Sequence, residues 1–348
     1  MENLSDITHR PFRLWEFLGE NAIKAVAFAG LATIMLIMAF VFREAYPIFK
    51  QSSGAAIDSS AYQAFETYGE QPTDSSTSAS TSASSRLLET AGRGGKVSAA
   101  NLLGTEWQPV SAEPKYGLWP LVAGSFKVTL IALLIAGPIG ILAALFAAAF
   151  APRWIQEIFK PAVEILAGFP SVVVGFFALV VLATFLQTLF GYRFRLNALV
   201  GGVALSLAVI PIIFTVTEDA LNAVPKSLTE ASLALGASKW QTVLFVVLQA
   251  ATPGVLAAMI LGFGRAFGET MIVLMATGNA ALLSPNPVEP VRTMSATIGA
   301  EMAEVVFGDT HYSVLFFIGA ILFAFTFILN AVAEFYVRQK LMKRFKGS

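Results

Sequence analysis

Two residues of opposite charge, Arg265 and Glu269, interrupt an apolar stretch at 254–277. A charge at mid-membrane costs roughly 2.5 to 3.5 kcal/mol on insertion scales, so such residues tend to face a bundle interior and serve a pathway. The planar fork of arginine suits phosphate or carboxylate, and a glutamate at i+4 can compensate it in the absence of an anion. We therefore expect an anion-handling pair. The alternative is a buried ion pair that only joins two subunits.

Two further features accompany this pair. Gly264 and Gly268 have the Gly-x-x-x-Gly spacing that permits close approach of a neighbouring helix, so we expect the charged face at a helix interface. Lys127 is another charged residue inside an apolar run. Its long side chain is expected to reach the outer surface, with a contact to an anion as the alternative.

The same inventory of reactive residues excludes several functions. The chain has no cysteine and only two histidines, His9 and His311, so we expect neither thiol chemistry nor a metal site. It has no phosphate-binding Gly-x4-Gly-Lys-Ser/Thr loop, so it is not expected to bind ATP or another cofactor. Neither histidine lies where it would pair with a serine in the bilayer, which disfavours a membrane-embedded hydrolase. Formal net charge is zero, which argues against nucleic-acid binding.

A polar helical hairpin precedes the charged pair. Ser227 with Glu230, and Ser238 with Gln241, have the Ser-x-x-Glu/Gln spacing of capping boxes, so each serine predicts a helix start. Gly236 stands where the first helix must end in the left-handed conformation. An apolar stripe then follows at helical spacing, at Trp240, Val243, Leu244, Val247 and Leu248. Periodicity alone is equally consistent with a hairpin lying on the membrane surface.

Composition identifies an integral membrane protein. Of the 348 residues, 56% are hydrophobic and 13% are charged, and the mean hydropathy is +0.69. A hydrocarbon core of roughly 30 Å needs about 20 helical residues, and six runs are long enough. They are expected at 22–42, 118–150, 163–190, 196–216, 254–277 and 314–336. The predicted fold is therefore an all-α polytopic membrane protein with six transmembrane helices.

Basic residues near the ends of the first and last spans place both termini in the cytoplasm. The predicted organisation is a cytoplasmic N-terminus (1–21), a first anchor helix (22–46), a periplasmic loop (47–117), a core of five spans (118–337) and a basic cytoplasmic tail (338–348). The loop contains a serine-rich insertion at 73–85, which has too little apolar surface to fold. The core contains a cytoplasmic loop at 217–249.

The hairpin resembles the "EAA" cytoplasmic loop of permease subunits from bacterial ATP-binding-cassette importers. The residues that match are Glu230, Ala231, Ser232, Gly236 and Ala237, with serine replacing the usual second alanine and Gln249 where a proline is common. The resemblance implies that this loop docks on a separate ATPase subunit, that ATP binds only to such partners, and that the chain has the architecture of a type I importer permease.

The stretch Gly-Arg-Ala-Phe-Gly-Glu-Thr-Met at 264–271 is similar to a motif of phosphate-specific transport permeases. Stretches at 102–110, 164–173 and 217–221 are similar to the same family, and to its C-type permeases more than to its A-type permeases. This resemblance implies a non-catalytic subunit of the bacterial inner membrane, in contact with lipid, a homologous permease subunit of the A type, two ATPase subunits and a periplasmic phosphate-binding protein. It also implicates Arg265 and Glu269 in phosphate passage. Transport of sulfate or molybdate, or a regulatory scaffold without transport, remain the alternatives.

Overall fold

The computed structural model describes residues 14–48, 99–111 and 113–345. Within them the chain is almost entirely helical. Six helices are long and apolar enough to cross a membrane: Lys24–Ala45, Trp119–Phe150, Ser171–Phe190, Ala198–Asn222, Lys239–Phe267 and Thr310–Ala333. The prediction of an all-α chain with six spans is confirmed. The serine-rich segment at 73–85 lies outside the described residues.

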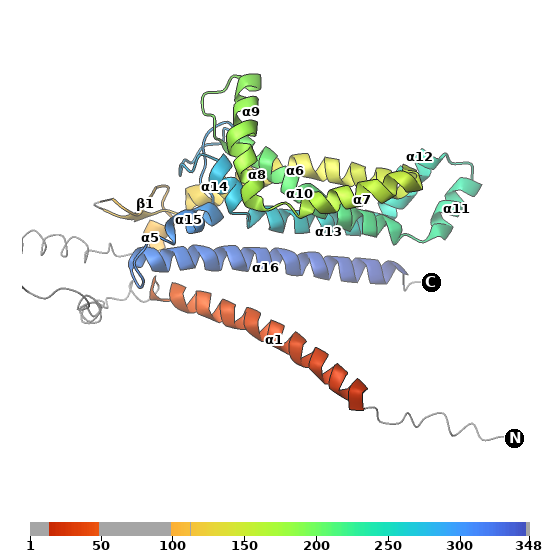
Figure 1. Ribbon diagram of the computed structural model, residues 1–348, viewed down its shortest axis with the longest axis horizontal. Helices are drawn as coiled ribbons and strands as arrows, with labels where there is room; N and C mark the ends of the chain where they lie inside the picture. The colour runs from red at the N-terminus through yellow and green to blue at the C-terminus, as the bar shows by residue number, and fades with distance from the viewer. Residues whose placement is uncertain (1–13, 49–98, 112, 346–348) are drawn as a thin grey trace, which may run out of the picture.

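Long helices run side by side to form the bundle (Figure 1). They are α6 (Trp119–Leu145), α10 (Ala198–Asn222), α13 (Leu248–Phe267) and α16 (Thr310–Phe345). α10 packs against both α6 and α13, α16 packs on α13, and α1 (Leu14–Ala45) packs on α16. Small side chains at the crossing of α6 and α10, such as Ala132 and Ala204, are completely buried. They let the two backbones approach closely, which is how helices gain packing energy in an apolar solvent.

The third span differs from its prediction. The span was expected at 163–190, but this run is divided between α7 (Arg153–Ala167) and α8 (Ser171–Phe177), and the spanning part begins only at Ser171. Pro170 has an extended ψ of 132° and cannot donate a helical hydrogen bond, so the chain turns there. α8 continues through the π-helical turn η2 (Ala178–Leu182) into α9 (Ala183–Phe190), and α9 projects away from the bundle in Figure 1.

The fifth span also differs, at both ends. The helix was expected at 254–277, but it begins at α12 (Lys239–Thr242) and continues through η3 (Val243–Val247) into α13. Pro253 lies inside α13 without ending it. The helix stops at Phe267, and a separate short helix, α14 (Met271–Ala276), follows after three residues. The break at 268–270 therefore lies within the predicted span.

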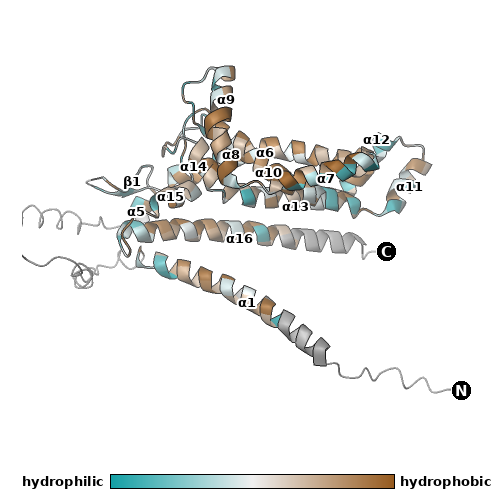
Figure 2. Cartoon of the chain, in the orientation of Figure 1, coloured by the Kyte–Doolittle hydropathy of each residue, from teal (hydrophilic) through white to brown (hydrophobic). Residues whose placement is uncertain are grey.

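Short elements lie at the two ends of the bundle. At one end are α5 (Ala99–Leu102), the antiparallel strands β1 (Trp107–Gln108) and β2 (Lys115–Tyr116), and α15 (Met294–Glu301). At the other end are α11 (Lys226–Ala234), α12 and the π-helical turn η1 (Phe146–Phe150), which ends α6. Figure 2 shows apolar residues along α6, α8 and α9, and hydrophilic residues on α12 and on part of α11. The apolar and polar parts of the chain are thus separated along the bundle.

The N-terminal end of α6 is held against the segment before α15. The hydroxyl of Ser125 accepts a hydrogen bond from the Met294 backbone N–H at 2.9 Å. A Cβ built on Gly124 would lie 2.2 Å from the carbonyl oxygen of Arg292. Because that contact is with backbone, which cannot rotate away, only glycine fits at this position.

We predict that Gly124→Ala lowers the free energy of unfolding by about 1 to 3 kcal/mol, the typical cost of overpacking. Thermal unfolding of the purified protein in detergent measures this change. Gly30→Ala is the matched control, because a Cβ at Gly30 would meet nothing within 4 Å. Equal unfolding temperatures for the two variants would contradict the close contact between α6 and Arg292.

Candidate functional site

The start of the second hairpin helix is capped as predicted. Ser238 Oγ accepts from the Gln241 backbone N–H at 3.3 Å, and Gln241 Oε1 accepts from the Ser238 N–H at 2.9 Å. The first predicted capping box is wrong. α11 begins one residue earlier, at Lys226, with Pro225 as its N-cap residue and no side-chain cap. Proline presets the backbone for a helix start, and Ser227 is consequently already inside the first turn.

The turn between α11 and α12 is closed by backbone hydrogen bonds. Gly236 has a φ of +86°, which is the left-handed conformation predicted from the sequence. Its N–H donates to the carbonyl of Leu233, and the N–H of Ala237 donates to the carbonyl of Ser232. These two bonds form a Schellman motif, which satisfies carbonyls at the end of a helix. These backbone bonds therefore define the geometry of the turn between α11 and α12.

Sequence reasoning missed a tie across the hairpin. The hydroxyls of Ser232 and Thr242 lie 2.9 Å apart. The serine that replaces the usual alanine in the loop motif thus joins α11 to the helix that continues into the membrane. The rest of α11 has no buried residue, and Leu235 is 89% exposed. α11 is thus an exposed helix at the end of the bundle.

Arg265 occupies the last turn of α13 and is exposed in the single chain. Among the described residues, its guanidinium has no hydrogen-bond or ion-pair partner. The ion pair with Glu269 expected from the i, i+4 spacing is wrong, because α13 ends at Phe267 and Glu269 lies beyond it. Glu269 Oε1 instead accepts from the Thr270 N–H at 3.2 Å. The arginine is left available to another group.

The two glycines of the Gly-x-x-x-Gly spacing have different surroundings. A Cβ on Gly264 would lie 3.1 Å from Asn330 Oδ1 of α16, whereas a Cβ on Gly268 would meet only the carbonyl of Gly264, at 3.7 Å. Next to Gly264, the rings of Phe267 and Phe325 pack at 4.5 Å between centroids. α13 is therefore held against α16 just before the break at 268–270.

Lys127 lies on α6 and points at the segment between α14 and α15. Its ammonium group donates to the backbone carbonyl of Ser284, and a second contact with the carbonyl of Asn286 measures 3.3 Å. These bonds hold the loop between α14 and α15 against α6. The structure thus uses the charge of Lys127 for a backbone contact rather than leaving it at the surface.

A buried polar cluster lies at the end of the bundle that holds β1 and α15, and it was not predicted from the sequence. Glu301 accepts from Trp107 Nε1 at 3.1 Å, contacts the Arg292 guanidinium at 2.7 Å, and lies 2.9 Å from His311 Nε2. Glu301 and His311 are each 9% exposed. Burial alone would raise the pKa of Glu301, but the hydrogen bonds from His311 and Trp107 and the charge of Arg292 outweigh it and lower the pKa. Glu301 therefore remains ionised and holds the β1–β2 pair to α15 and α16.

α15 connects this cluster to the candidate anion site. Glu301 lies at the C-terminal end of α15, and Ser295 lies near its N-terminal end. Ser295 Oγ donates to the backbone carbonyl of Glu269 at 2.6 Å. One short helix thus positions the break that carries Glu269 relative to the outer cluster. Among the described residues, no group of histidine and carboxylate side chains could hold a metal ion.

Comparison with known proteins gives concordant results. Residues 136–341 match the model of a family described as "binding-protein-dependent transport system inner membrane component". The chain is 37% identical over 227 residues to a probable ABC transporter permease protein, YqgH, of Bacillus subtilis, with 65% of this chain and 74% of that protein covered. It is 35% identical over 253 residues to the phosphate transport system permease protein PstC of Mesorhizobium japonicum, with 67% of this chain and 76% of that protein covered.

A solved structure is similar in fold. A chain of the bacterial alginate ABC transporter, crystallised in complex with an alginate pentasaccharide-bound periplasmic protein, aligns with a TM-score of 0.53. The alignment covers 95% of this chain and 99% of that chain at 13% identity. At that identity the likeness concerns the arrangement of helices alone.

We predict that Ser238→Ala destabilises the start of α12 by about 1 kcal/mol, the usual cost of losing an N-cap side chain. Hydrogen exchange of the backbone amides at 239–242 measures the effect and should become faster. Ser227→Ala is the matched control and should leave exchange in α11 unchanged, because Ser227 caps no helix. Equal effects of the two substitutions would contradict the single capping box.

We predict that Glu301→Gln lowers the free energy of unfolding at neutral pH by about 1.5 to 3 kcal/mol, since it weakens hydrogen bonds to a buried charge. Folding lowers the pKa of Glu301 below its ordinary value of 4.5, so its stabilisation is present above pH 4.5 and is lost as the pH falls through the lowered pKa. The difference between wild type and variant should therefore shrink below pH 4.5 in thermal unfolding in detergent. Glu304→Gln, at an exposed position one turn away, is the control and should change stability little.

Proposed function

Because the chain belongs to the family of binding-protein-dependent transport system inner membrane components, we propose that it is a permease subunit of an ATP-driven importer of inorganic phosphate. Membership of this family makes the chain a multi-pass component of the inner membrane and a non-catalytic part of a transport system. The identity of the substrate and of the individual partners goes beyond family membership and is our proposal.

The observation that carries the phosphate proposal is the unpaired guanidinium of Arg265 on a membrane-spanning helix. A charge in that position needs a partner or water, and a planar fork of donors matches the oxygens of phosphate. In Figure 1, α13 ends short of the end of the bundle at which α5, β1 and α15 lie, which supports an interior position for Arg265. The similarity to phosphate transport permeases in several bacteria supports the same substrate.

The proposed partners follow from the two ends of the bundle. We propose that the hairpin residues Glu230, Ala231, Ser232, Gly236 and Ala237 dock on an ATPase subunit, and that the complex contains two ATPase subunits, a homologous permease subunit of the A type and a periplasmic phosphate-binding protein. The first turns of α1, the last turns of α16 and the hairpin lie toward one end of the molecule in Figure 1, which supports cytoplasmic placement of both termini. The other end, with the β1–β2 pair, then faces the periplasm.

The proposed mechanism assigns different roles to the two charged residues. Arg265 binds phosphate while the path is open to the periplasm. Glu269 lies in the break between α13 and α14, where movement of three residues changes its position without moving either helix far. When phosphate leaves, the carboxylate of Glu269 approaches the guanidinium and replaces the anion as its counter-charge. This exchange lets one arginine bind and release phosphate in each cycle.

The chemistry of Arg265 does not by itself separate phosphate from sulfate or molybdate. A regulatory scaffold would use the hairpin and need no charge in the membrane, so the unpaired arginine favours transport. Uptake measurements distinguish these three functions.

We predict that vesicles carrying the reconstituted complex accumulate labelled phosphate on addition of ATP and binding protein, without competition from excess sulfate or molybdate. Arg265→Gln should abolish accumulation, because it removes the charge that binds the anion. Copurification of the ATPase subunits should be unchanged, since Arg265 has no partner in the described fold.

Arg193→Gln is the control for loss of a cation. Its guanidinium lies 5.3 Å from the ring of Phe194 in the turn after α9, and uptake should persist. Full uptake by Arg265→Gln would contradict the role of Arg265. Competition by sulfate would widen the substrate class, and an assembled complex without any uptake would favour the scaffold.

A further inference from the structure

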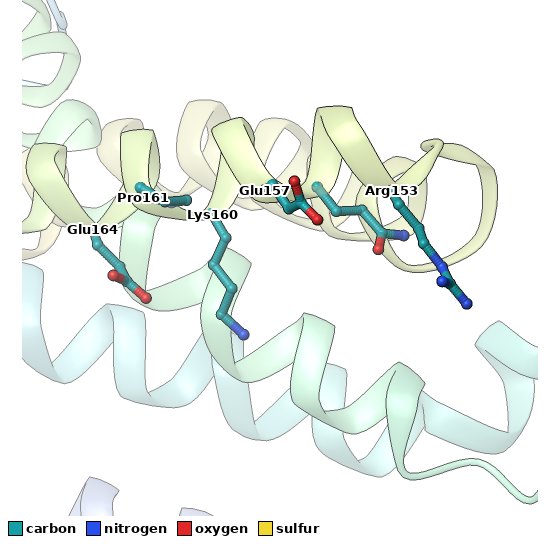
Figure 3. A pocket seen from close by; sticks show the side chains of 6 residues that line it. Arg153, Glu157, Lys160, Pro161 and Glu164 are labelled. Carbon is teal, nitrogen blue, oxygen red and sulfur yellow. The ribbon is translucent and has the colours of Figure 1, made fainter.

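α7 carries a row of charges that the function proposed above does not explain. Arg153, Glu157, Lys160 and Glu164 follow one another at three- and four-residue spacing, so they share one side of the helix, and all are exposed. With Gln156 and Pro161 they line an open groove of about 510 Å³ (Figure 3). We refer to the four charged residues as the α7 charged stripe.

The opposite sides of α7 are apolar. Phe159 packs its ring 5.7 Å from that of Phe214 on α10, which fixes the inner side of the helix. Ile158 and Ile165 form another apolar surface, 64% and 66% exposed in the single chain, which suits lipid or a neighbouring protein. The stripe is separate from both, so it faces neither the bundle core nor this apolar surface.

The stripe runs along the cytoplasmic half of the bundle. Figure 1 shows α7 beside α10, against which it packs, starting at the end that holds α12. The distance from residue 153 to residue 164 is roughly 16 Å along a helix, about half of a hydrocarbon core of roughly 30 Å. Charges over that length require water or a polar partner. Pro161 leaves one backbone carbonyl of α7 without its helical donor, and water beside this exposed helix can satisfy it.

The C-terminal end of the stripe, at Glu164, leads toward the candidate anion site at Arg265 and Glu269. After Glu164 the chain turns at Pro170 and enters α8. α8 packs on α14, and a Cβ on Gly175 would lie 3.0 Å from the carbonyl of Met271, two residues after Glu269. The segment that follows the stripe therefore contacts the segment that follows the break.

One charge in the stripe is held loosely. Lys160 Nζ lies 3.7 Å from Glu218 Oε2 of α10, which is longer than a hydrogen bond, and the Lys160 side chain is 51% exposed. Glu218 Oε2 is buried and has no hydrogen-bond partner among the described residues. An ammonium group on a flexible stem can leave such a pair and contact another anion.

We propose that the α7 charged stripe lines the cytoplasmic exit of the anion path. Lys160 is then a second, weaker phosphate-binding site after Arg265. The proposal rests on the transport function above. Carboxylates alternate with cations along the stripe, so no position holds an anion tightly. Conduction needs sites that bind strongly enough for entry and weakly enough for departure.

Cysteine substitution tests this exit directly, because the chain has no cysteine of its own. Lys160→Cys and Glu164→Cys are compared with Ile158→Cys and Ile165→Cys, which are similarly accessible on the apolar side of the same helix. The complex is reconstituted in vesicles with the ATPase side outward and treated with a water-soluble, membrane-impermeant thiol reagent. We expect rapid modification at 160 and 164, slow modification at 158 and 165, and slower modification at 160 when inorganic phosphate is present.

Transport provides the second readout. Lys160→Gln should lower the maximal rate of phosphate uptake roughly three- to tenfold, because a partly exposed charge contributes up to about one tenfold step. The phosphate concentration for half-maximal uptake should change little, since capture occurs at the opposite side of the membrane. Lys160→Arg should restore the rate, and copurification of the ATPase subunits should be unchanged in both variants.

Several results would overturn the proposal. Unreactive cysteines at 160 and 164 would mean that another protein of the complex covers the stripe, and equal reactivity at all four positions would mean that the stripe is not a separate aqueous surface. Protection of position 160 by anionic lipid but not by phosphate would identify a headgroup site. In each of these cases wild-type uptake stays intact, whereas loss of wild-type phosphate uptake would reject the transport function itself.

Discussion

The placement of charges in this chain depends on the cost of leaving a polar group without water or a partner in an apolar surrounding. Glu301 shows the fully paired case: three side chains from separate parts of the sequence satisfy one buried carboxylate. Lys127 shows a second case, in which an ammonium group binds backbone carbonyls of a loop. Arg265 differs from both, since the described fold gives its guanidinium no partner. Its environment must therefore be completed by water, another protein of the complex or a bound anion.

The route from the hairpin to Arg265 is a continuous helix. α12, η3 and α13 together span Lys239–Phe267, 29 residues without a break. The capping box at Ser238 fixes the start of this helix, and the Ser232–Thr242 contact joins it to α11. A displacement of the hairpin would therefore be passed along the whole helix, and the first break beyond Arg265 is at 268–270. The π-helical turn η3 is an irregularity along this path, in addition to Pro253, and such turns recur at functional sites.

The features that could be predicted from the sequence are those set by neighbouring residues. The Ser238 capping box and the left-handed Gly236 depend on local chemistry and were found in the structure. Ser227 had the same local pattern, but Pro225 determined the helix start instead. The Arg265–Glu269 pair failed because i, i+4 spacing has meaning only inside a helix, and the sequence did not reveal that α13 ends at Phe267. The Glu301 cluster was beyond reach, because Trp107 and Glu301 are 194 residues apart.

Firmly paired and loosely paired charges lie in different parts of the molecule. At the end of the bundle that holds β1 and β2, Glu301 and Ser295 fix both ends of α15, and through it the backbone of Glu269. On α7, Lys160 holds Glu218 only at 3.7 Å. A transporter needs both firmly paired and loosely paired charges. Firm pairing holds the rigid part against which a binding site moves, and loose pairing leaves cations free to bind and release an anion. The described contacts place firmly bonded groups around α15 and a loosely held ion pair on α7, so both properties occur in this one chain.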